Sequence, residues 1–322
     1  MHQRTPPPDF VIVGAPKCGT TAVHRTLQSH PEIFLPSIKE PHYFHAEWGA
    51  RRGVDTIEAY DYLFEPAGQG QIRGEASVMY LSSATAIEAI VERRPDVKLI
   101  AHVRNPVDLF VSWHNQCLKD LDEDISDPEL AWGLQEQRSQ GRALPRDCHE
   151  PTSLQYRSIC LLGNQIKRLF DLVPPSQRFV LVFDDLRDRP ADVYKQLLDF
   201  LNVSDDGRRG FIRENDFSRP KSRVIALLAR SIQVNPILKK IRVRIKPILN
   251  RNGIHIIERT LQRNLVPAPR PQLASAFRQK LCEEFRADVS LLSTLLKRDL
   301  RYWLGDPASQ EFLVQGGQST TR

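Results

Sequence analysis

The feature that most constrains the chain is the stretch from residue 10 to residue 21, which reads Phe-Val-Ile-Val-Gly-Ala-Pro-Lys-Cys-Gly-Thr-Thr. Its first four residues form an apolar run short enough to be a buried parallel strand. Gly14 and Gly19 let the backbone turn, and a helix is expected from about Thr20. The first N–H groups of a helix have no intrahelical partner and favour an anion. The stretch therefore predicts a phosphate-binding loop, although the same glycines also suit a tight turn without a ligand.

The loop differs from the nucleotide-binding P-loop in the position of its lysine. In that motif the lysine follows the second glycine and reaches the β and γ phosphates. Thr20 occupies this position here, and Lys17 comes three residues earlier, which argues against an ordinary ATP or GTP hydrolase. Pro-Lys-x-Gly-Thr-Thr after an apolar strand resembles instead the 5′-phosphosulfate loop of sulfotransferases that use 3′-phosphoadenosine-5′-phosphosulfate (PAPS). The resemblance implies donor binding by Pro16, Lys17, Cys18, Gly19, Thr20 and Thr21, with Lys17 stabilising the moving group and no catalytic role for Cys18.

A second strand-to-helix junction lies in residues 97–115. Asn105 and Pro106 suit the cap and the first position of a helix, so Arg104 is expected at the carboxyl end of a strand, where open α/β sheets bind ligands. Ser112 lies two turns along the helix. An arginine and a hydroxyl suit a terminal phosphate. In the sulfotransferase family this pattern is the 3′-phosphate site of PAPS, so the resemblance assigns that site to Arg104 and Ser112.

The expected 3′-phosphate site departs from the family pattern at Leu109, where many relatives carry another arginine. Further along the chain, residues 219–223 lie where the family often closes a loop over this phosphate. The resemblance therefore implies that Arg219 and Arg223 complete the grip, together with Lys221 and Ser222.

Glu40 lies about twenty residues after the loop, in the stretch Lys-Glu-Pro-His-Tyr-Phe. An acceptor hydroxyl or amine becomes a useful nucleophile only as its proton departs, and a positioned carboxylate can take that proton. In sulfotransferases of the heparan-sulfate type, a glutamate in this context is the general base, so the resemblance assigns that role to Glu40. His42 and His45 lack the further ligands of a zinc site and are interpreted as acceptor-pocket or surface residues.

Residues 72–80 are expected to form the next strand and its exit. Glu75-Ala76-Ser77-x-x-Tyr80 resembles the family pattern Glu-Lys-[Ser/Thr]-x-x-Tyr, except that Ala76 replaces the lysine. The replacement removes a cation that would contact substrate or sulfonate. The strand also lacks the Lys-x-His of the cytosolic small-molecule branch, which favours Glu40 as the base and leaves Glu75 as the second candidate.

Strands and helices alternate along the chain, which predicts an α/β fold with a P-loop-like central parallel sheet flanked by helices in a single domain. Helices are expected at 83–94, 105–119, 154–172 and 192–201, a strand at 179–183, and an irregular or partly helical excursion at 120–150. Residues 285–303 resemble the closing helix of bacterial members. The expected organisation is a flexible segment at 1–8, a sulfotransferase domain at 9–305 and a disordered tail at 306–322. Asp184 and Asp185 resemble a magnesium-holding strand end but are interpreted as a structural turn.

Composition is compatible with one cytoplasmic enzyme. The chain has 322 residues of which 41% are hydrophobic, enough for a substantial core. The sequence before residue 9 has no apolar stretch, so neither a signal peptide nor a membrane anchor is expected. The five cysteines are odd in number and widely spaced, which indicates reduced thiols. No cluster of metal ligands is evident, and no metal is expected.

The basic charge of the chain is concentrated in residues 219–263, which hold 12 Lys and Arg against one acid, a net charge of +11. Residues 237–249 show a basic amphipathic pattern, with Ile237, Ile241, Ile245 and Ile248 on one helical face. Three interpretations stay open, namely a core-facing helix with a solvated basic rim, docking on an anionic membrane surface, and a groove for an acidic saccharide. A membrane-peripheral location is thus an alternative within the cytoplasmic assignment, and no nucleic-acid partner is expected.

These features predict a PAPS-dependent sulfotransferase that acts on a hydroxyl or amine, with a carbohydrate as the first candidate acceptor and a lipid-linked or other small alcohol behind it. Such transfer depends on alignment and charge stabilisation. A P-loop kinase is an alternative, but it would need a lysine at Thr20. A non-catalytic binder of acidic polymers or membranes would explain the basic segment, but not the phosphate loop, the arginine motif and the glutamate together.

Overall fold

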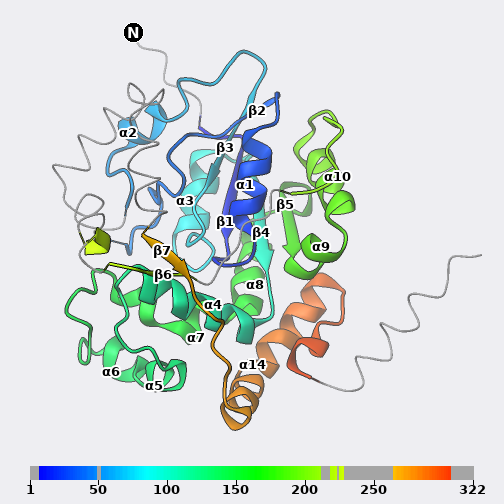
Figure 1. The fold of residues 1–322 in the computed structure, drawn as a ribbon. Helices are drawn as coiled ribbons and strands as arrows, with labels where there is room; N and C mark the ends of the chain where they lie inside the picture. The colour runs from blue at the N-terminus through cyan, green and yellow to red at the C-terminus, as the bar shows by residue number, and fades with distance from the viewer. Residues whose placement is uncertain (1–6, 49–51, 212–217, 223–224, 228–263, 306–322) are drawn as a thin grey trace, which may run out of the picture.

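Five parallel strands form the central sheet of the protein, seen here in a computed structural model (Figure 1). The structure describes residues 7–48, 52–211, 218–222, 225–227 and 264–305. The strands are β1 (Phe10–Gly14), β2 (Ile33–Phe34), β3 (Ile72–Ala76), β4 (Lys98–Val103) and β5 (Arg178–Val182), in the spatial order β2-β3-β1-β4-β5. Since β1 is central, the loop that follows it emerges in the middle of the carboxyl edge of the sheet. The predicted α/β fold with a parallel sheet is confirmed.

Helices connect the strands, as the alternation in the sequence predicted. The helices are α1 (Thr20–Gln28), α2 (Ile57–Tyr62), α3 (Ala86–Arg93), α4 (Pro106–Lys119), α5 (Pro128–Gly133), α6 (Gln135–Ser139), α7 (Tyr156–Cys160), α8 (Leu162–Leu172), α9 (Phe183–Asp188), α10 (Pro190–Leu201) and α14 (Ser275–Leu296), with 3₁₀ turns η1 (Pro151–Leu154), η2 (Pro175–Gln177) and η3 (Arg301–Leu304). The short α5 and α6 lie within the predicted excursion at 120–150, which is therefore partly helical.

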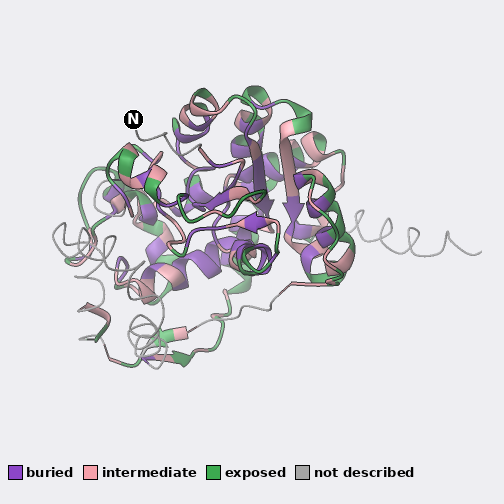
Figure 2. Ribbon diagram, turned by 90° about the horizontal axis from the view of Figure 1, so that it is seen from above, coloured by how far each residue is buried: buried purple, intermediate pink, exposed green. Residues whose placement is uncertain are grey.

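Alternate residues of β1 pack on opposite faces of the sheet, as the two-residue period of a strand requires. Phe10 and Ile12 belong to a cluster with residues of α1 and α10. Val11 and Val13 belong to a larger cluster with residues of α3, α4, α7, α8 and α14. Both faces are thus covered by helices, and the two central strands β1 and β4 are almost fully buried (Figure 2). This burial explains why β1 and the centre of β4 read as apolar runs.

One predicted helix, at 154–172, is divided into α7 and α8. The break lies at Leu161, and the buried carboxylate of Asp288 on α14 accepts hydrogen bonds at the start of α8 from the backbone N–H of Gly163 at 2.7 Å and of Asn164 at 2.9 Å. A carboxylate that satisfies these N–H groups stabilises a new helix start. The closing helix also begins ten residues before Phe285 and ends at Leu296, because Lys297 turns into a left-handed conformation.

The basic segment at 219–263 was predicted to be largely helical, and this stays a prediction because most of the segment lies outside the described residues, although its first two residues belong to a strand. Residues Ser218–Pro220 form strand β6, which pairs antiparallel with β7 (Leu265–Pro267), and β6 packs against α4. The proposed membrane-docking stretch at 237–249, most of the segment at 1–8 and the tail at 306–322 lie outside the described residues. Among the residues that the structure describes, no helix has the length and apolar character needed to cross a membrane.

Candidate active site

The phosphate loop joins the carboxyl end of β1 to α1. Gly19, with φ at 85°, is the N-cap of α1, and no side chain caps this nine-residue helix. Its first N–H groups are therefore available to an anion. A Cβ at Gly14, where φ is 125°, would lie 2.0 Å from the carbonyl oxygen of Val78, and a Cβ at Gly19 would lie 2.5 Å from Leu186. Both glycines are thus required by close packing around the loop.

Lys17 reaches across the loop to α4. Its Nζ donates a hydrogen bond to Oε1 of Gln116 at 3.0 Å, and its backbone has a left-handed φ of 59°. Such a conformation is uncommon for a residue with a side chain and concentrates at functional sites. Burial lowers the pKa of Lys17, and the neighbouring Lys119 adds to this effect. A bound anion would offset both influences. Sequence reasoning missed Gln116, although it lies one helical turn after Ser112 on the same face of α4.

The other residues of the loop contribute mainly through their backbone. The Cys18 thiol is fully buried and donates to the carbonyl oxygen of Pro16 at 3.3 Å, and burial raises the pKa of this thiol to about 12. The thiol is thus shielded from solvent, and the prediction that Cys18 binds PAPS stays a prediction that concerns its backbone N–H. Thr20, the first residue of α1, is buried, while Thr21 is partly exposed.

Arg104 lies beside the loop, where the sequence placed it. Its Nη1 donates to the carbonyl oxygen of Lys17 at 2.9 Å, and the guanidinium lies 4.5 Å from the ring centroid of Phe183. Its Nε is buried with no hydrogen-bond partner among the described residues. The predicted cap of α4 is confirmed, since the Asn105 side chain accepts from Val107 N at 2.9 Å. Ser112 is nearly buried, one turn before the residue that holds Lys17.

Arg219 and Arg223, the other residues predicted to bind the 3′-phosphate, are not seen in contact with Arg104 or Ser112 in the described part of the chain. Arg219 lies on β6 and acts electrostatically on His114 of α4, while Arg223 lies outside the described residues. Leu109 is fully buried and cannot contact a ligand. A cation that sequence reasoning missed is Arg270, which pairs with Asp108 in the first turn of α4 at 2.6 Å and contributes to lowering the pKa of Arg104, after burial.

The Glu40 carboxylate lies between the Lys39 ammonium and the His42 ring. Oε1 pairs with the Lys39 ammonium, and Oε2 lies 3.3 Å from Nε2 of His42. Burial alone would raise the pKa of Glu40, but Lys39 and His42 outweigh it and hold the pKa below its ordinary value. The Glu40 backbone is left-handed, with φ at 63°, and its N–H donates to the carbonyl oxygen of Ala76 at 2.9 Å. The prediction that His42 could be a surface residue is wrong, because it is buried against this carboxylate.

Aromatic packing fixes the segment that carries Glu40. The Tyr43 ring stacks on Tyr60 of α2 at 5.1 Å, and the Phe44 ring meets Tyr60 edge-on at 5.2 Å. The His42 ring packs edge-on against Trp48 at 4.6 Å. Phe44 N also donates to the hydroxyl of Tyr80 at 3.2 Å, beyond the end of β3. A positioned carboxylate needs such support, because small displacements of a catalytic group are costly.

Glu75, the alternative base, is a buried carboxyl on β3. It is only 1% exposed and accepts a hydrogen bond from the Tyr60 hydroxyl at 3.0 Å. Burial raises the pKa of Glu75 to about 7, and the charge of Glu40 adds to this effect. The two glutamates therefore differ in their protonation, since Glu40 is held ionised and Glu75 titrates near neutral pH.

This difference predicts a pH-dependent stability. Since the folded pKa of Glu75 lies above its ordinary 4.5, its contribution is full below pH 4.5 and is lost as the pH rises through 7, by roughly 3 kcal/mol in all. We expect the free energy of unfolding of the wild type to fall relative to that of Glu75→Gln between pH 4.5 and 8. Urea unfolding of both proteins across this range measures the difference, and parallel curves would contradict the prediction.

Asp184 and Asp185 are engaged in structural contacts. Asp184 accepts hydrogen bonds from the Tyr302 hydroxyl at 2.7 Å and from Trp303 Nε1 at 2.6 Å. Asp185 pairs with Arg189 at 2.7 Å and with Arg298. These contacts tie α9 to Arg298 and to η3, so both carboxylates have structural partners, although they lie in the first turn of a helix and not in the predicted turn.

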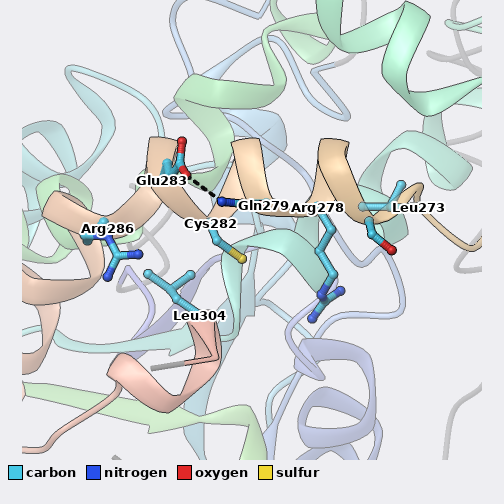
Figure 3. A pocket seen from close by; sticks show the side chains of 8 residues that line it. Leu273, Arg278, Gln279, Cys282, Glu283, Arg286 and Leu304 are labelled. Carbon is cyan, nitrogen blue, oxygen red and sulfur yellow. Dashed lines mark hydrogen bonds between the residues drawn. The ribbon is translucent and has the colours of Figure 1, made fainter. Parts of the chain in front are cut away.

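A hollow of about 320 Å³ lies along α14 (Figure 3). Its lining comes from α14, the segment before it and η3, and it includes Arg278, Cys282, Arg286 and Leu304. None of the predicted site residues lines it. The candidate site lies instead at the carboxyl edge of the sheet, where Arg104 donates to the Lys17 carbonyl oxygen and the charges of Glu40 and Arg104 both act on Lys17.

The chain is similar to known sulfotransferases in sequence and in fold. The human bifunctional heparan sulfate N-deacetylase/N-sulfotransferase 3 is 28% identical over 215 residues, which is 61% of this chain and 22% of that protein. Human carbohydrate sulfotransferase 15 is 51% identical over 56 residues, 17% of this chain and 9% of that protein. The matches thus span about a fifth or less of these relatives. A sulfotransferase from Alicyclobacillus acidocaldarius has the same fold, with a TM-score of 0.66 at 24% identity, covering 92% of this chain and 98% of that one.

A protein family also matches the chain, over more of its length than the two sequence relatives do. The family described as "Sulfotransferase domain" matches residues 7–233, which include β1 to β5, the phosphate loop, Glu40 and Arg104. Because this match spans more than half of the chain, the protein belongs to the sulfotransferase domain family.

Proposed function

We propose that the protein transfers a sulfonate group from PAPS to a hydroxyl or amine of an acceptor, with a saccharide as the first candidate. The main observation behind this proposal is the contact between Arg104 and the phosphate loop. Nη1 of Arg104 donates a hydrogen bond to the Lys17 carbonyl oxygen at 2.9 Å, and no side chain caps the start of α1 that follows the loop. Two cations and a helix start at one place suit a ligand with two phosphate groups.

The donor would be held at both of its charged ends. The backbone N–H groups of residues 17–21, with Pro16 shaping the loop before them, would bind the 5′-phosphosulfate. The Lys17 ammonium would contact the sulfonate or the bridging oxygen. Arg104 and Ser112 would bind the 3′-phosphate, and the buried unpartnered Nε of Arg104 is a donor that this anion would satisfy. Arg270 acts electrostatically on Arg104 and would supply a second cation for the 3′-phosphate, in place of the arginine that Leu109 replaces. Arg219 and Arg223 are further candidates for this role.

Glu40 would act as the general base. In the reaction, a bond forms between the acceptor oxygen or nitrogen and sulfur, while the bond between sulfur and the bridging oxygen breaks. The electron pair of the broken bond remains on 3′-phosphoadenosine-5′-phosphate, and the acceptor proton passes to Glu40. Lys17 would stabilise the charge that develops on the bridging oxygen, so no step requires a covalent enzyme intermediate.

A saccharide acceptor is supported by the names of the relatives, which include heparan sulfate and carbohydrate sulfotransferases. A lipid-linked acceptor at an anionic membrane surface would require residues 237–249, which lie outside the described part of the chain. A kinase is disfavoured because Thr20 replaces the P-loop lysine and because Asp184 and Asp185 are already engaged.

Calorimetric titration with 3′-phosphoadenosine-5′-phosphate tests the proposal without knowledge of the acceptor. We expect the wild type to bind this bisphosphate in preference to ATP with magnesium. Lys17→Ala and Arg104→Ala should each weaken binding by about tenfold or more, because each removes charge-assisted hydrogen bonds.

The exposed Arg209, which pairs with Asp205 far along the chain from the loop, provides the matched control, and Arg209→Ala should bind as the wild type does. Preference for ATP, or no nucleotide binding by the wild type, would contradict the proposed function. Salt-sensitive binding of an anionic polysaccharide that survives Lys17→Ala and Glu40→Ala, without turnover in the intact protein, would support a non-catalytic binder instead.

A further inference from the structure

Lys39 is a cation at the centre of the site to which the sequence motifs gave no role. Its ammonium pairs with Oε1 of Glu40, and its side chain is only 21% exposed. The backbone N–H of Glu40 donates to the carbonyl oxygen of Ala76 at 2.9 Å, so this segment lies directly against the end of β3. An exposed ion pair between neighbouring residues would contribute little, but this one is partly buried at the carboxyl edge of the sheet.

The charge of Lys39 also acts on the elements that form the phosphate loop. His24 on α1 and His102 on β4 both have a pKa lowered to about 4, by burial first and by Lys39 in addition. Nδ1 of His102 lies 3.1 Å from the carbonyl oxygen of Cys18 inside the loop. The ammonium is therefore within electrostatic range of α1 and β4, and its side chain is largely shielded from solvent.

The strand beside this segment ends in a small, uncharged side chain. Ala76 ends β3 and packs in the same cluster as residues of α1, so its side chain faces the side of the sheet where His24 and His102 lie. It is 2% exposed and carries no charge. At this position the chain has only a methyl group, and the residue whose N–H donates to the Ala76 carbonyl oxygen is Glu40, which directly follows Lys39.

We propose that Lys39 supplies the cation that contacts the transferring sulfonate, in place of the lysine absent at position 76. The inference rests on the proposed function. In the free protein the ammonium is held by Glu40, which keeps it beside the loop. When the donor binds, a second anion arrives next to the same ammonium, and its three N–H groups can serve the Glu40 carboxylate and a sulfonate oxygen together. Lys39 would thus align the base with the group that moves.

Two ligands that differ only in the sulfonate test this assignment. We expect Lys39→Met to bind PAPS about tenfold or more weakly than the wild type, as expected for loss of a hydrogen bond to a charged group. Binding of 3′-phosphoadenosine-5′-phosphate, which has no sulfonate, should change by less than about twofold, which also reports that the variant is folded. Lys39→Arg should retain most of the PAPS affinity, because it keeps the charge. Calorimetry or competition between the two ligands measures both affinities.

Lys167 offers a matched control, since it also forms an ion pair, with Asp171 at 2.6 Å, but on the exposed surface of α8. Lys167→Met should leave both affinities unchanged. Full PAPS affinity in Lys39→Met, or equal loss of both ligands, would overturn the role of Lys39 while leaving the proposed function intact. Failure of the wild type to bind either ligand would instead remove the proposed function, and this inference with it.

Discussion

Glu40→Gln is expected to lower the rate of sulfonate transfer by about 10²- to 10⁴-fold, the usual contribution of a positioned general base. Glutamine keeps the size of the side chain, and its amide oxygen can still accept a hydrogen bond from Lys39, but it cannot take up a proton from the acceptor group. Affinity for 3′-phosphoadenosine-5′-phosphate should change by less than about twofold. Mass spectrometry of sulfated product from a panel of saccharides, under single-turnover conditions, measures the rate.

The pKa of Glu40 adds a second expectation for the same experiment. Because Lys39 and His42 hold this pKa below its ordinary value, the carboxylate stays ionised as the pH falls, and Glu40 should cause no loss of activity between pH 8 and pH 5. Glu58→Gln, in the exposed first turn of α2, is the matched control and should be fully active. Retained activity in Glu40→Gln, together with loss in Glu75→Gln, would transfer the role of base to Glu75.

Arg138→Ala is expected to destabilise the protein by about 3–5 kcal/mol. The guanidinium forms two hydrogen bonds to the Glu123 carboxylate, at 2.6 and 2.8 Å, and both side chains are fully buried. The Tyr156 hydroxyl completes the site with a hydrogen bond to Glu123 at 2.6 Å. Truncation of the arginine would leave a carboxylate buried without its cation. Urea unfolding followed by circular dichroism measures the change.

Two further variants separate this effect from a simple loss of side-chain volume. Arg138→Met combined with Glu123→Leu removes both charges and should recover most of the lost stability, because it leaves no unpaired charge. Arg157→Ala breaks a more exposed pair with Glu284 and should cost less than about 1 kcal/mol. A loss below about 1 kcal/mol in Arg138→Ala would show that the buried pair is not what stabilises the excursion at 120–150.

Local sequence patterns predicted the sheet and the backbone of the site. The apolar runs of β1 and β4, the glycines of the loop and the Asn105 cap each act within a few residues, so their spacing alone indicates the structure. These elements also determine where Lys17 and Arg104 leave the sheet. The meeting of these two residues follows from the adjacency of β1 and β4, which the order of strands in a parallel sheet favours.

Pairings between distant residues could not be predicted in this way. Gln116 holds a lysine 99 positions earlier in the chain, and Asp288 starts a helix 125 positions before it. Arg138 and Glu123 would read as surface charges in a polar stretch, yet they are fully buried. Each contact depends on how whole elements pack, and a one-dimensional pattern carries no information on that packing.

The hydrogen bond between Asn105 and η3 affects when the PAPS site can form during synthesis of the chain. Nδ2 of Asn105, the cap of the helix that follows Arg104, donates to the carbonyl oxygen of Trp303 at 2.7 Å. A growing chain folds from its N-terminal end. The phosphate loop can thus form on the ribosome long before residue 303 is added. The hydrogen bond from Asn105 to Trp303, next to Arg104 in the chain, cannot form until then. Capacity to bind the donor should therefore be gained late in synthesis, when the last turn docks.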